Sequence, residues 1–130
     1  MEASIVTVRP ESMSGSLQKL AMFVGISGPS AGATRLSLYK VLIPPGGKAE
    51  PHSHAGHETA IYLIKGRVET RYGEGLRQSV INQAGDFIFI PPDLPHQPVN
   101  LSDTEFAEAI VARSDPNEQE SVVPYSVEAE

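Results

Sequence analysis

The chain has 130 residues, no cysteine and a formal net charge of −6. This length suits one domain with its own core, and the lack of cysteine excludes disulfides, thiolate metal ligands and cysteine nucleophiles. The acidic balance argues against a nucleic-acid partner, because phosphate binding needs a basic patch. No apolar run reaches the ~18 to 20 residues of a membrane span, and the first residues lack the features of a signal peptide. We therefore expect a soluble, cytoplasmic protein with no nucleic-acid and no membrane partner.

The N-terminal part has weak patterns. Residues 5–8 alternate as an edge strand would, and Pro10 ends the alternation. Within residues 12–23 apolar side chains recur at near-helical spacing, but Ser14 and Gly15 interrupt them. A short helix and an irregular segment are equally compatible with that pattern. Residues 25–32 have the composition of a loop, so this part predicts no firm element.

From Thr34 onward the sequence predicts β-structure. Short alternating or apolar runs recur about every 8 to 12 residues with Gly/Pro turns between them, which is typical of a sandwich or barrel. The predicted strands are residues 36–43, 60–64, 67–72, 76–81, 86–90, 99–101 and 105–112. The fold class that we expect is therefore all-β.

The last part of the chain, residues 114–130, holds few apolar residues and much of the acidity. This composition is typical of a solvated tail. Val122, Val123 and Tyr125 also allow it to pack across the barrel or a partner subunit, and partial disorder is a third alternative. We expect one domain over residues 1–130, with a core at about 34–113, an N-terminal arm at 1–33 and a C-terminal tail at 114–130.

Three of the four histidines lie close together, at His52, His54 and His57, and Glu58 follows at once. Side chains two residues apart on an extended strand share a face, so His52 and His54 can reach the same ion. Two imidazoles and a carboxylate suit a first-row divalent metal. The fourth histidine, His96, follows a proline-rich turn. A fold that brings the two stretches together would complete a metal site.

These residues resemble the two motifs of the small single-domain cupins. The first motif is matched by Gly46, His52, His54, Glu58 and Gly66, and the second by Gly85, Pro91, His96 and Asn100. Asp93 stands where the family has glycine, and we interpret Asn100 as a structural residue that makes hydrogen bonds. The resemblance implies a double-stranded β-helix, or jelly-roll barrel, that is often a homodimer. It also implies one divalent metal ion in the mouth: zinc, iron, manganese, nickel or copper.

The sequence leaves the fourth metal ligand open. Counting forward from His54 places Glu58 there, whereas counting back from Gly66 places Thr59 there, because seven residues rather than six separate Glu58 from Gly66. A β-bulge would let Glu58 reach the metal. Otherwise His57 takes its place, since strand parity points it to the same side. That second arrangement resembles the zinc cupins that cyclise polyketides with four histidines.

The resemblance implies a small metalloenzyme in which the metal polarises a carbonyl or enolate oxygen or binds dioxygen. Zinc favours Lewis-acid chemistry such as cyclisation or isomerisation, whereas iron, copper, nickel or manganese allows dioxygenation. We expect a small-molecule substrate of aromatic, enol or polyketide-like type. Tyr62, Phe87 and Phe89 are candidates to line its cavity, although ordinary core packing explains them equally well. The alternative is a non-catalytic small-molecule-binding or sensor module, because a fold does not fix a function.

Overall fold

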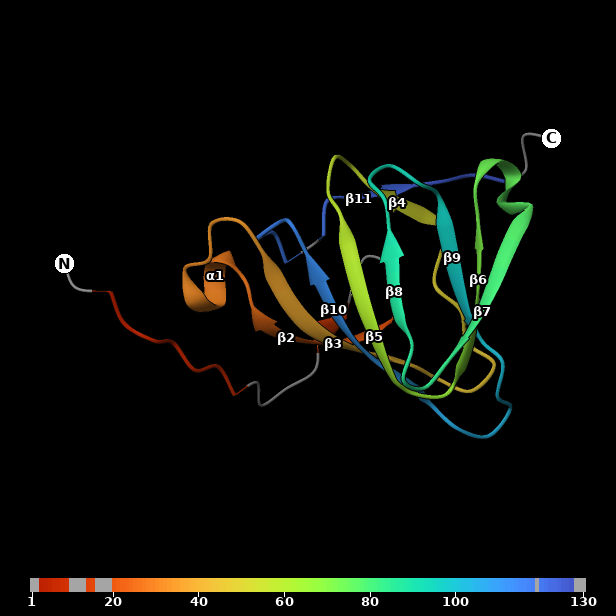
Figure 1. The fold of residues 1–130 in the computed structure, drawn as a ribbon, viewed down its shortest axis with the longest axis horizontal. Helices are drawn as coiled ribbons and strands as arrows, with labels where there is room; N and C mark the ends of the chain where they lie inside the picture. The colour runs from red at the N-terminus through yellow and green to blue at the C-terminus, as the bar shows by residue number, and fades with distance from the viewer. Residues whose placement is uncertain (1–2, 10–13, 16–19, 119, 128–130) are drawn as a thin grey trace.

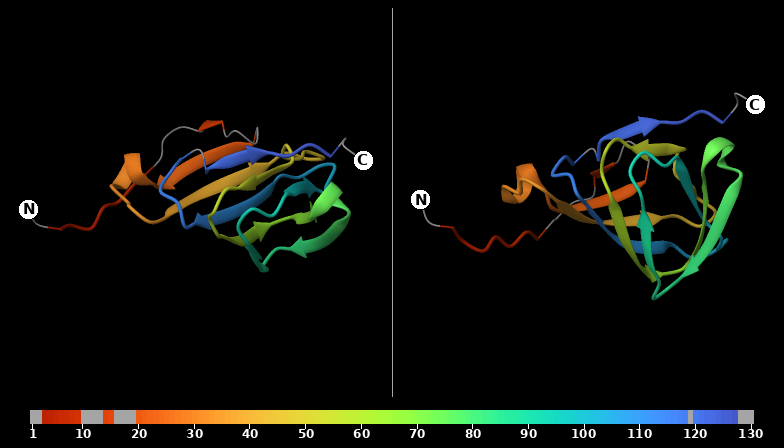
Figure 2. Two further views of the ribbon diagram at one scale, coloured as in Figure 1. Left: turned by 90° about the horizontal axis from the view of Figure 1, so that it is seen from above. Right: turned by 45° about the horizontal axis from the view of Figure 1, so that its top comes forward.

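The structure, a computed structural model, describes residues 3–9, 14–15, 20–118 and 120–127. Nearly all regular structure in these ranges is β, arranged as two antiparallel sheets that face each other and curve into a barrel (Figures 1 and 2). Residues 3–9 extend away from this barrel and are mostly exposed (Figure 1). The predicted all-β class is therefore confirmed.

The two sheets draw their strands from along the chain. The larger sheet contains β1 (Ser14–Gly15), β2 (Ala21–Ile26), β3 (Ser37–Ile43), β5 (Thr59–Lys65), β8 (Phe87–Ile90) and β10 (Ala107–Arg113). The smaller sheet contains β4 (His52–His54), β6 (Arg67–Tyr72), β7 (Gln78–Gln83), β9 (His96–Asn100) and β11 (Val122–Pro124). The strand orders are β1-β2-β3-β10-β5-β8 and β11-β4-β9-β6-β7. Neighbours in space are often distant in sequence, so each sheet joins early and late segments of the chain.

The N-terminal segment differs from the expected alternatives. Residues 21–26 form strand β2, which pairs with β3, where the sequence suggested a short helix or an irregular segment. Hydrogen bonding to the neighbouring strand outweighs the near-helical spacing, because β-structure depends strongly on tertiary context. Within the predicted loop at residues 25–32 lies a four-residue helix, α1 (Gly28–Ala31). Residues 5–8 are extended but form no strand, and residues 10–13 and 16–19 lie outside the described ranges.

The core lies between the two sheets. Alternate residues of β3 point inward, and Tyr39, Val41 and Ile43 pack there with Leu63 of β5 and Val111 of β10. Burying such side chains stabilises the fold by about 1.5 to 3 kcal/mol each. The structure thus shows which residues of β3 point into the core, whereas the alternation in the sequence showed only which residues share a face.

Two residues of the cupin-like motifs have clear backbone roles. Gly66 has a φ of 104°, and a Cβ atom there would lie 2.9 Å from the Cβ of Ala107, so a side chain is excluded on two grounds. The amide of Asn100 donates hydrogen bonds to the carbonyls of Ile43, Pro44 and Glu105 at 2.8 to 3.1 Å. The interpretation of Asn100 as structural is confirmed.

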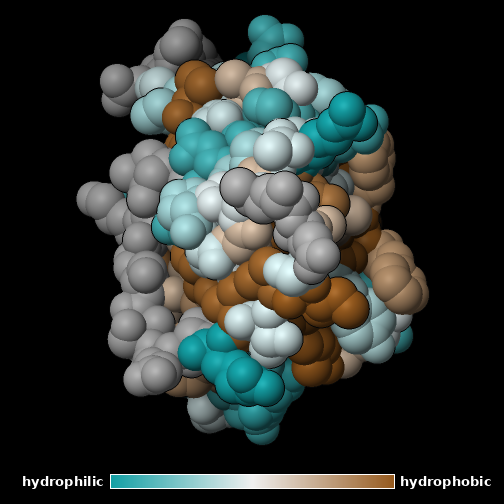
Figure 3. Space-filling model, turned by 90° about the vertical axis from the view of Figure 1, so that its left-hand side faces the viewer, coloured by the Kyte–Doolittle hydropathy of each residue, from teal (hydrophilic) through white to brown (hydrophobic). Residues whose placement is uncertain are grey.

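The aromatic residues proposed for the cavity lie elsewhere. Tyr62, Phe87 and Phe89 point to the outer face of the larger sheet, where their exposed fractions are 40%, 84% and 60%. They belong to neither the cavity nor the core, because in both strands the alternate residues face inward. Apolar side chains also reach the surface on the side of the molecule that carries α1 (Figure 3). The expected homodimer stays a prediction, and an apolar outer face is compatible with it.

None of the helices in the described ranges is long and apolar enough to cross a membrane.

Candidate metal centre

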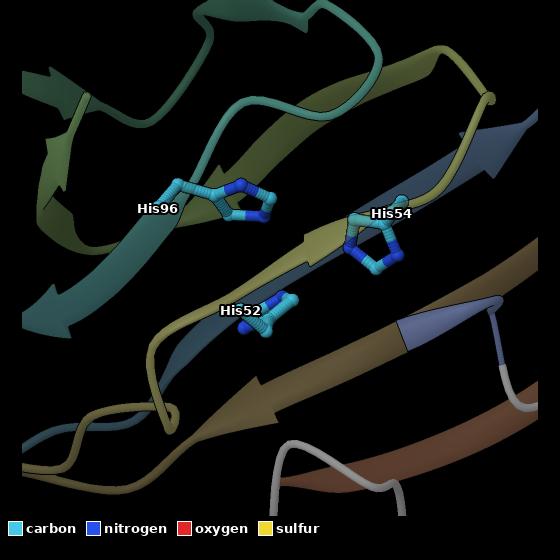
Figure 4. A group of neighbouring side chains, drawn as sticks. All are labelled: His52, His54 and His96. Carbon is cyan, nitrogen blue, oxygen red and sulfur yellow. The ribbon is translucent and has the colours of Figure 1, made fainter. Parts of the chain in front are cut away.

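Three histidines meet on the inner face of the smaller sheet. His52 and His54 lie two residues apart on β4, and His96 begins the antiparallel strand β9, where it pairs directly with His52. All three are buried, with exposed fractions of 2% to 4%. Their rings point toward one another (Figure 4), with centroids 4.4 to 5.3 Å apart. The fold therefore brings the two motifs together as the sequence predicted.

Backbone carbonyls orient each ring. Nδ1 of His52 lies 2.6 Å from the carbonyl oxygen of Glu50, and Nδ1 of His96 lies 2.8 Å from that of Leu94. Nδ1 of His54 lies 2.6 Å from the carbonyl oxygen of Glu120. A carbonyl oxygen only accepts, so Nδ1 carries the proton in every ring and Nε2 keeps its lone pair. This is the usual outer contact of a histidine that binds a metal.

The cluster fits a divalent metal ion. One nitrogen from each ring lies within 4.8 Å of the others. Nε2 of His54 is buried and has no hydrogen-bond partner among the described residues. A buried polar atom without a partner costs about 1 to 3 kcal/mol, and a metal ion at this point would accept its lone pair. The three histidines therefore form a site that can hold such an ion.

The surroundings keep the rings neutral. Burial lowers the pKa of His52 to about 3 and that of His54 to about 2. Burial also lowers the pKa of His96, and the guanidinium of Arg113 adds to the effect on all three rings. Since a metal binds the neutral form, these ligands need lose no proton at neutral pH.

Neither predicted fourth ligand joins the cluster. Glu58 is exposed, and the side chain of the next residue, Thr59, is buried where β5 begins. Alternation along the strand therefore turns Glu58 outward. The register shift of β5 against β10 lies at the other end of the strand, between Leu63 and Lys65, and does not reverse this. His57 is partly exposed, and its Nε2 lies 3.7 Å from the carboxylate of Asp115. The structure thus places Glu58 and His57 outside the cluster formed by the three histidines.

A charged pair that sequence reasoning missed borders the histidines. Nη1 of Arg113 lies 2.8 Å from Oε2 of Glu120, and Nε of Arg113 donates a hydrogen bond of 2.9 Å to Oγ1 of Thr59. The guanidinium also donates to the hydroxyl of Tyr39. Burial by itself favours the neutral forms, so it lowers the pKa of Arg113 and raises that of Glu120, but with 2.8 Å between the two groups we take the pair as ionised. Their direct contact opposes both shifts, because each charge favours the other.

Glu120 reaches this place because the C-terminal segment folds back over the barrel. Strand β11 pairs with β4, and Val122 lies opposite His54. Figure 2 shows this segment running along the upper edge of the barrel. Of the three alternatives for the tail, packing across the barrel is correct for residues 120–127. The apolar pair Val122 and Val123 was the signal in the sequence, but it does not reveal that Glu120 points inward.

The histidines and the charged pair border a cavity of about 80 Å³. Its other walls are mainly aliphatic side chains from both sheets, among them Val41, Leu63, Val68 and Val111. For comparison, an engineered cavity of ~150 Å³ holds benzene. The smaller space here favours a molecule smaller than an aromatic ring.

Comparison with known proteins was made at the level of families, sequences and structures. A family model described as "Cupin domain" matches residues 39–112. Germin-like protein subfamily T member 3 of Arabidopsis thaliana is 34% identical over an alignment of 104 residues, which covers 76% of this chain and 42% of that protein. The chain thus spans about two fifths of the length of this curated relative.

Solved structures share the fold. Oxalate decarboxylase of Lactobacillus farciminis in its formate complex has a TM-score of 0.73 and 22% identity, over 87% of this chain and 33% of that one. A Cupin 2 conserved barrel domain protein of Salinispora arenicola CNS-205 has a TM-score of 0.70 and 21% identity, over 86% and 91%. At these identities the likeness is one of fold, and the predicted jelly-roll barrel is confirmed.

Proposed function

Because this chain belongs to the cupin family, we propose that it binds one divalent metal ion and acts on a small molecule at the barrel mouth. The ligands are His52, His54 and His96. One observation carries the proposal: three buried rings bring one nitrogen each to within 4.8 Å of the others, and Nε2 of His54 has no hydrogen-bond partner among the described residues. The metal is zinc, iron, manganese, nickel or copper, all of which imidazole ligands accept.

A bound metal would polarise a carbonyl or enolate oxygen as a Lewis acid or, if redox-active, support oxidation. The chain itself contributes binding and shape. Three neutral imidazoles leave coordination positions for a substrate oxygen, and the aliphatic walls keep bulk water away from it. The carbonyls of Glu50, Leu94 and Glu120 fix the direction of each ring. These residues favour an enzyme of cyclase, isomerase or dioxygenase type that uses one small oxygen-bearing substrate.

The size of the cavity refines the substrate class. A cavity of about 80 Å³ favours a small enol or carboxylate. An aromatic or polyketide-like molecule would have to extend out through the mouth. Structures of oxalate decarboxylase with formate and of oxalate oxidase with glycolate are among the similar folds, which supports a small carboxylate. The likeness to polyketide cyclases with four histidines has no such support, because His57 lies beside Asp115 instead.

Metal analysis tests the proposal most directly. We expect wild-type protein, purified without a histidine tag and reconstituted, to hold close to one divalent ion per chain. His54→Ala should lose most of it, because the variant removes a ligand whose Nε2 has no other partner. His57→Ala is the matched control and should keep the metal. A wild-type protein that binds no divalent metal after reconstitution would refute the proposal.

The second candidate function is a non-catalytic binding or sensor module. The small, mainly apolar cavity favours it, because pockets of this kind hold small molecules whether or not a reaction follows. Incubating the metal-loaded protein with a panel of small enols and carboxylates distinguishes the two. Turnover supports the enzyme, whereas tight retention of an unchanged molecule supports the module.

A further inference from the structure

Two oppositely charged side chains are buried beside the histidines. Arg113 is 4% exposed and Glu120 is 2% exposed, and both border the cavity that the histidines border. Burying an ion pair is costly, and a hydrophobic pair of similar size often serves stability as well. The pair therefore calls for a role besides stability.

The backbone around Glu120 holds it in a strained conformation. Glu120 and Ser121 have φ values of 68° and 48°, in the left-handed region that side chains disfavour. Such strain persists only where the surroundings impose it, and it is concentrated at functional sites. Here the carbonyl of Glu120 accepts a hydrogen bond from Nδ1 of His54, and the amide of Ala55 donates to the carbonyl of Ser121 at 3.1 Å. The metal centre and the C-terminal segment are thus built as one unit.

The charge of Arg113 acts on the metal centre. Its guanidinium is buried and borders the same cavity as the three histidines, so its positive charge acts on any ion that they hold. A positive charge in a buried site disfavours a second cation beside it. In a buried site this repulsion is weakly screened by salt. A divalent ion can therefore bind well only if a carboxylate balances Arg113.

Glu120 is the carboxylate in position to do so. Counting back from Gly66, the fourth ligand position of the first motif is occupied by Thr59, which has no carboxylate. The neighbouring Glu58 is exposed. Glu108 also borders the cavity, but it is partly exposed and lies 3.5 Å from Nζ of Lys40. Asp115 is buried too and its charge also acts on Arg113, but it is not part of the cavity wall. Glu120 alone of these carboxylates is fully buried, borders the cavity and contacts Arg113 directly.

We propose that Glu120, carried over the barrel mouth by the C-terminal segment, balances the charge of Arg113 and so allows a divalent metal ion to bind among the histidines. The inference rests on the metal binding proposed above. Glu120 acts here through Arg113 and through space, as a residue that sets the charge of the site and not as a metal ligand. The chain thereby supplies from its C-terminal segment a carboxylate that its first motif does not bring to the cluster.

Metal affinity tests this role without any assay of activity. We would compete zinc between the protein and a chromogenic chelator, using wild type, Glu120→Gln and Glu58→Gln. Glu120→Gln keeps the size and the backbone of the residue but removes its charge, and should weaken zinc binding about 10- to 100-fold, as loss of an outer contact does. Glu58→Gln removes an exposed charge and should stay within about twofold of wild type.

A second variant separates charge from structure. If repulsion by Arg113 is the cause, adding Arg113→Met to Glu120→Gln should recover most of the lost zinc affinity. A structural defect would not be repaired in this way. Thermal unfolding checks that each metal-free variant folds, and if Glu120→Gln does not, Glu120→Asp and the double variant carry the comparison.

The outcomes are distinct. Zinc affinity of Glu120→Gln equal to wild type, or a double variant that binds no better than Glu120→Gln, would overturn the role of Glu120 while leaving the metal site intact. Absence of zinc binding in the wild type would instead overturn the proposed function, and with it this inference.

Discussion

Two regions of the molecule each bring a glutamate toward the histidines, and only one of them places it inside. Glu58 follows four residues after His54 on the same loop, yet it is exposed. Glu120 follows 66 residues after His54 and is 2% exposed beside the same cavity. Strand parity turns Glu58 outward, whereas the pairing of β11 with β4 carries Glu120 inward. Proximity to a motif in the sequence is therefore a weaker guide to a site than the pairing of the strands.

The largest expected effect comes from the buried histidines, which should make the free energy of unfolding depend on pH. In the folded, metal-free protein the pKa values of His52 and His54 are about 3 and 2, against 6.5 in the unfolded chain. As the pH falls below 6.5, the unfolded chain takes up protons that the folded chain does not. The free energy of unfolding should therefore fall between about pH 6.5 and pH 3, by up to ~1.4 kcal/mol per pH unit for each ring.

Urea unfolding of the metal-free protein at several pH values measures this slope. His52→Asn should make the slope shallower, because one buried ring no longer titrates on unfolding. Equal slopes in wild type and His52→Asn would contradict the lowered pKa of the buried ring.

A middle-sized effect is expected at Thr59, the buried neighbour of Glu58. Thr59→Val keeps the shape but removes the acceptor for Nε of Arg113, which lies 2.9 Å away. A buried donor without its partner should lower the free energy of unfolding by about 1 to 3 kcal/mol. Thr7→Val, at an exposed position, is the matched control and should change it by less than ~0.5 kcal/mol. If Thr59→Val loses no more stability than this control, the hydrogen bond between Arg113 and Thr59 does not contribute to the free energy of unfolding.

The smallest effects are expected on the exposed side of the loop. His57→Ala removes a partly exposed contact with Asp115 at 3.7 Å, so the free energy of unfolding should change by about 0 to 1 kcal/mol. Thermal unfolding measures this change, and calorimetric titration with zinc checks that metal affinity stays the same. A marked loss of zinc affinity would mean that the loop rearranges to bring His57 to the metal, which would remove the distinction between the two sides.

Several parts of the fold and the histidine cluster could be predicted from the sequence, because in short strands the spacing of residues determines which side chains share a face. His52 and His54 share a face by simple alternation, and Gly66 and Asn100 sit where the chain needs a turn and a hydrogen-bond donor. Other parts depend on contacts between distant segments. Arg113 ends β10 and Glu120 belongs to an acidic tail, so neither spacing nor composition indicates that they meet.

The same limit explains the placement of the aromatic residues. Alternation grouped Phe87 with Phe89 on one face of β8, but only the packing of the two sheets shows that this face is the outer one. Likewise, the sequence pattern did not predict strand β2, which is defined by its pairing with β3. Which face of a strand is buried, and which strand it pairs with, depend on the assembled barrel and cannot be read from the sequence of one strand.

The position of β11 also has a practical consequence for how the protein is prepared. This strand runs antiparallel to the strand that carries His52 and His54, so anything fused shortly after it starts near the metal centre. A C-terminal run of histidines would add competing imidazoles there, and a nickel resin could load the site with the wrong ion. An affinity tag on the N-terminal arm, which extends away from the barrel, avoids both problems (Figure 1). Metal content measured on the two tagged forms should then differ even though the folded domain is the same.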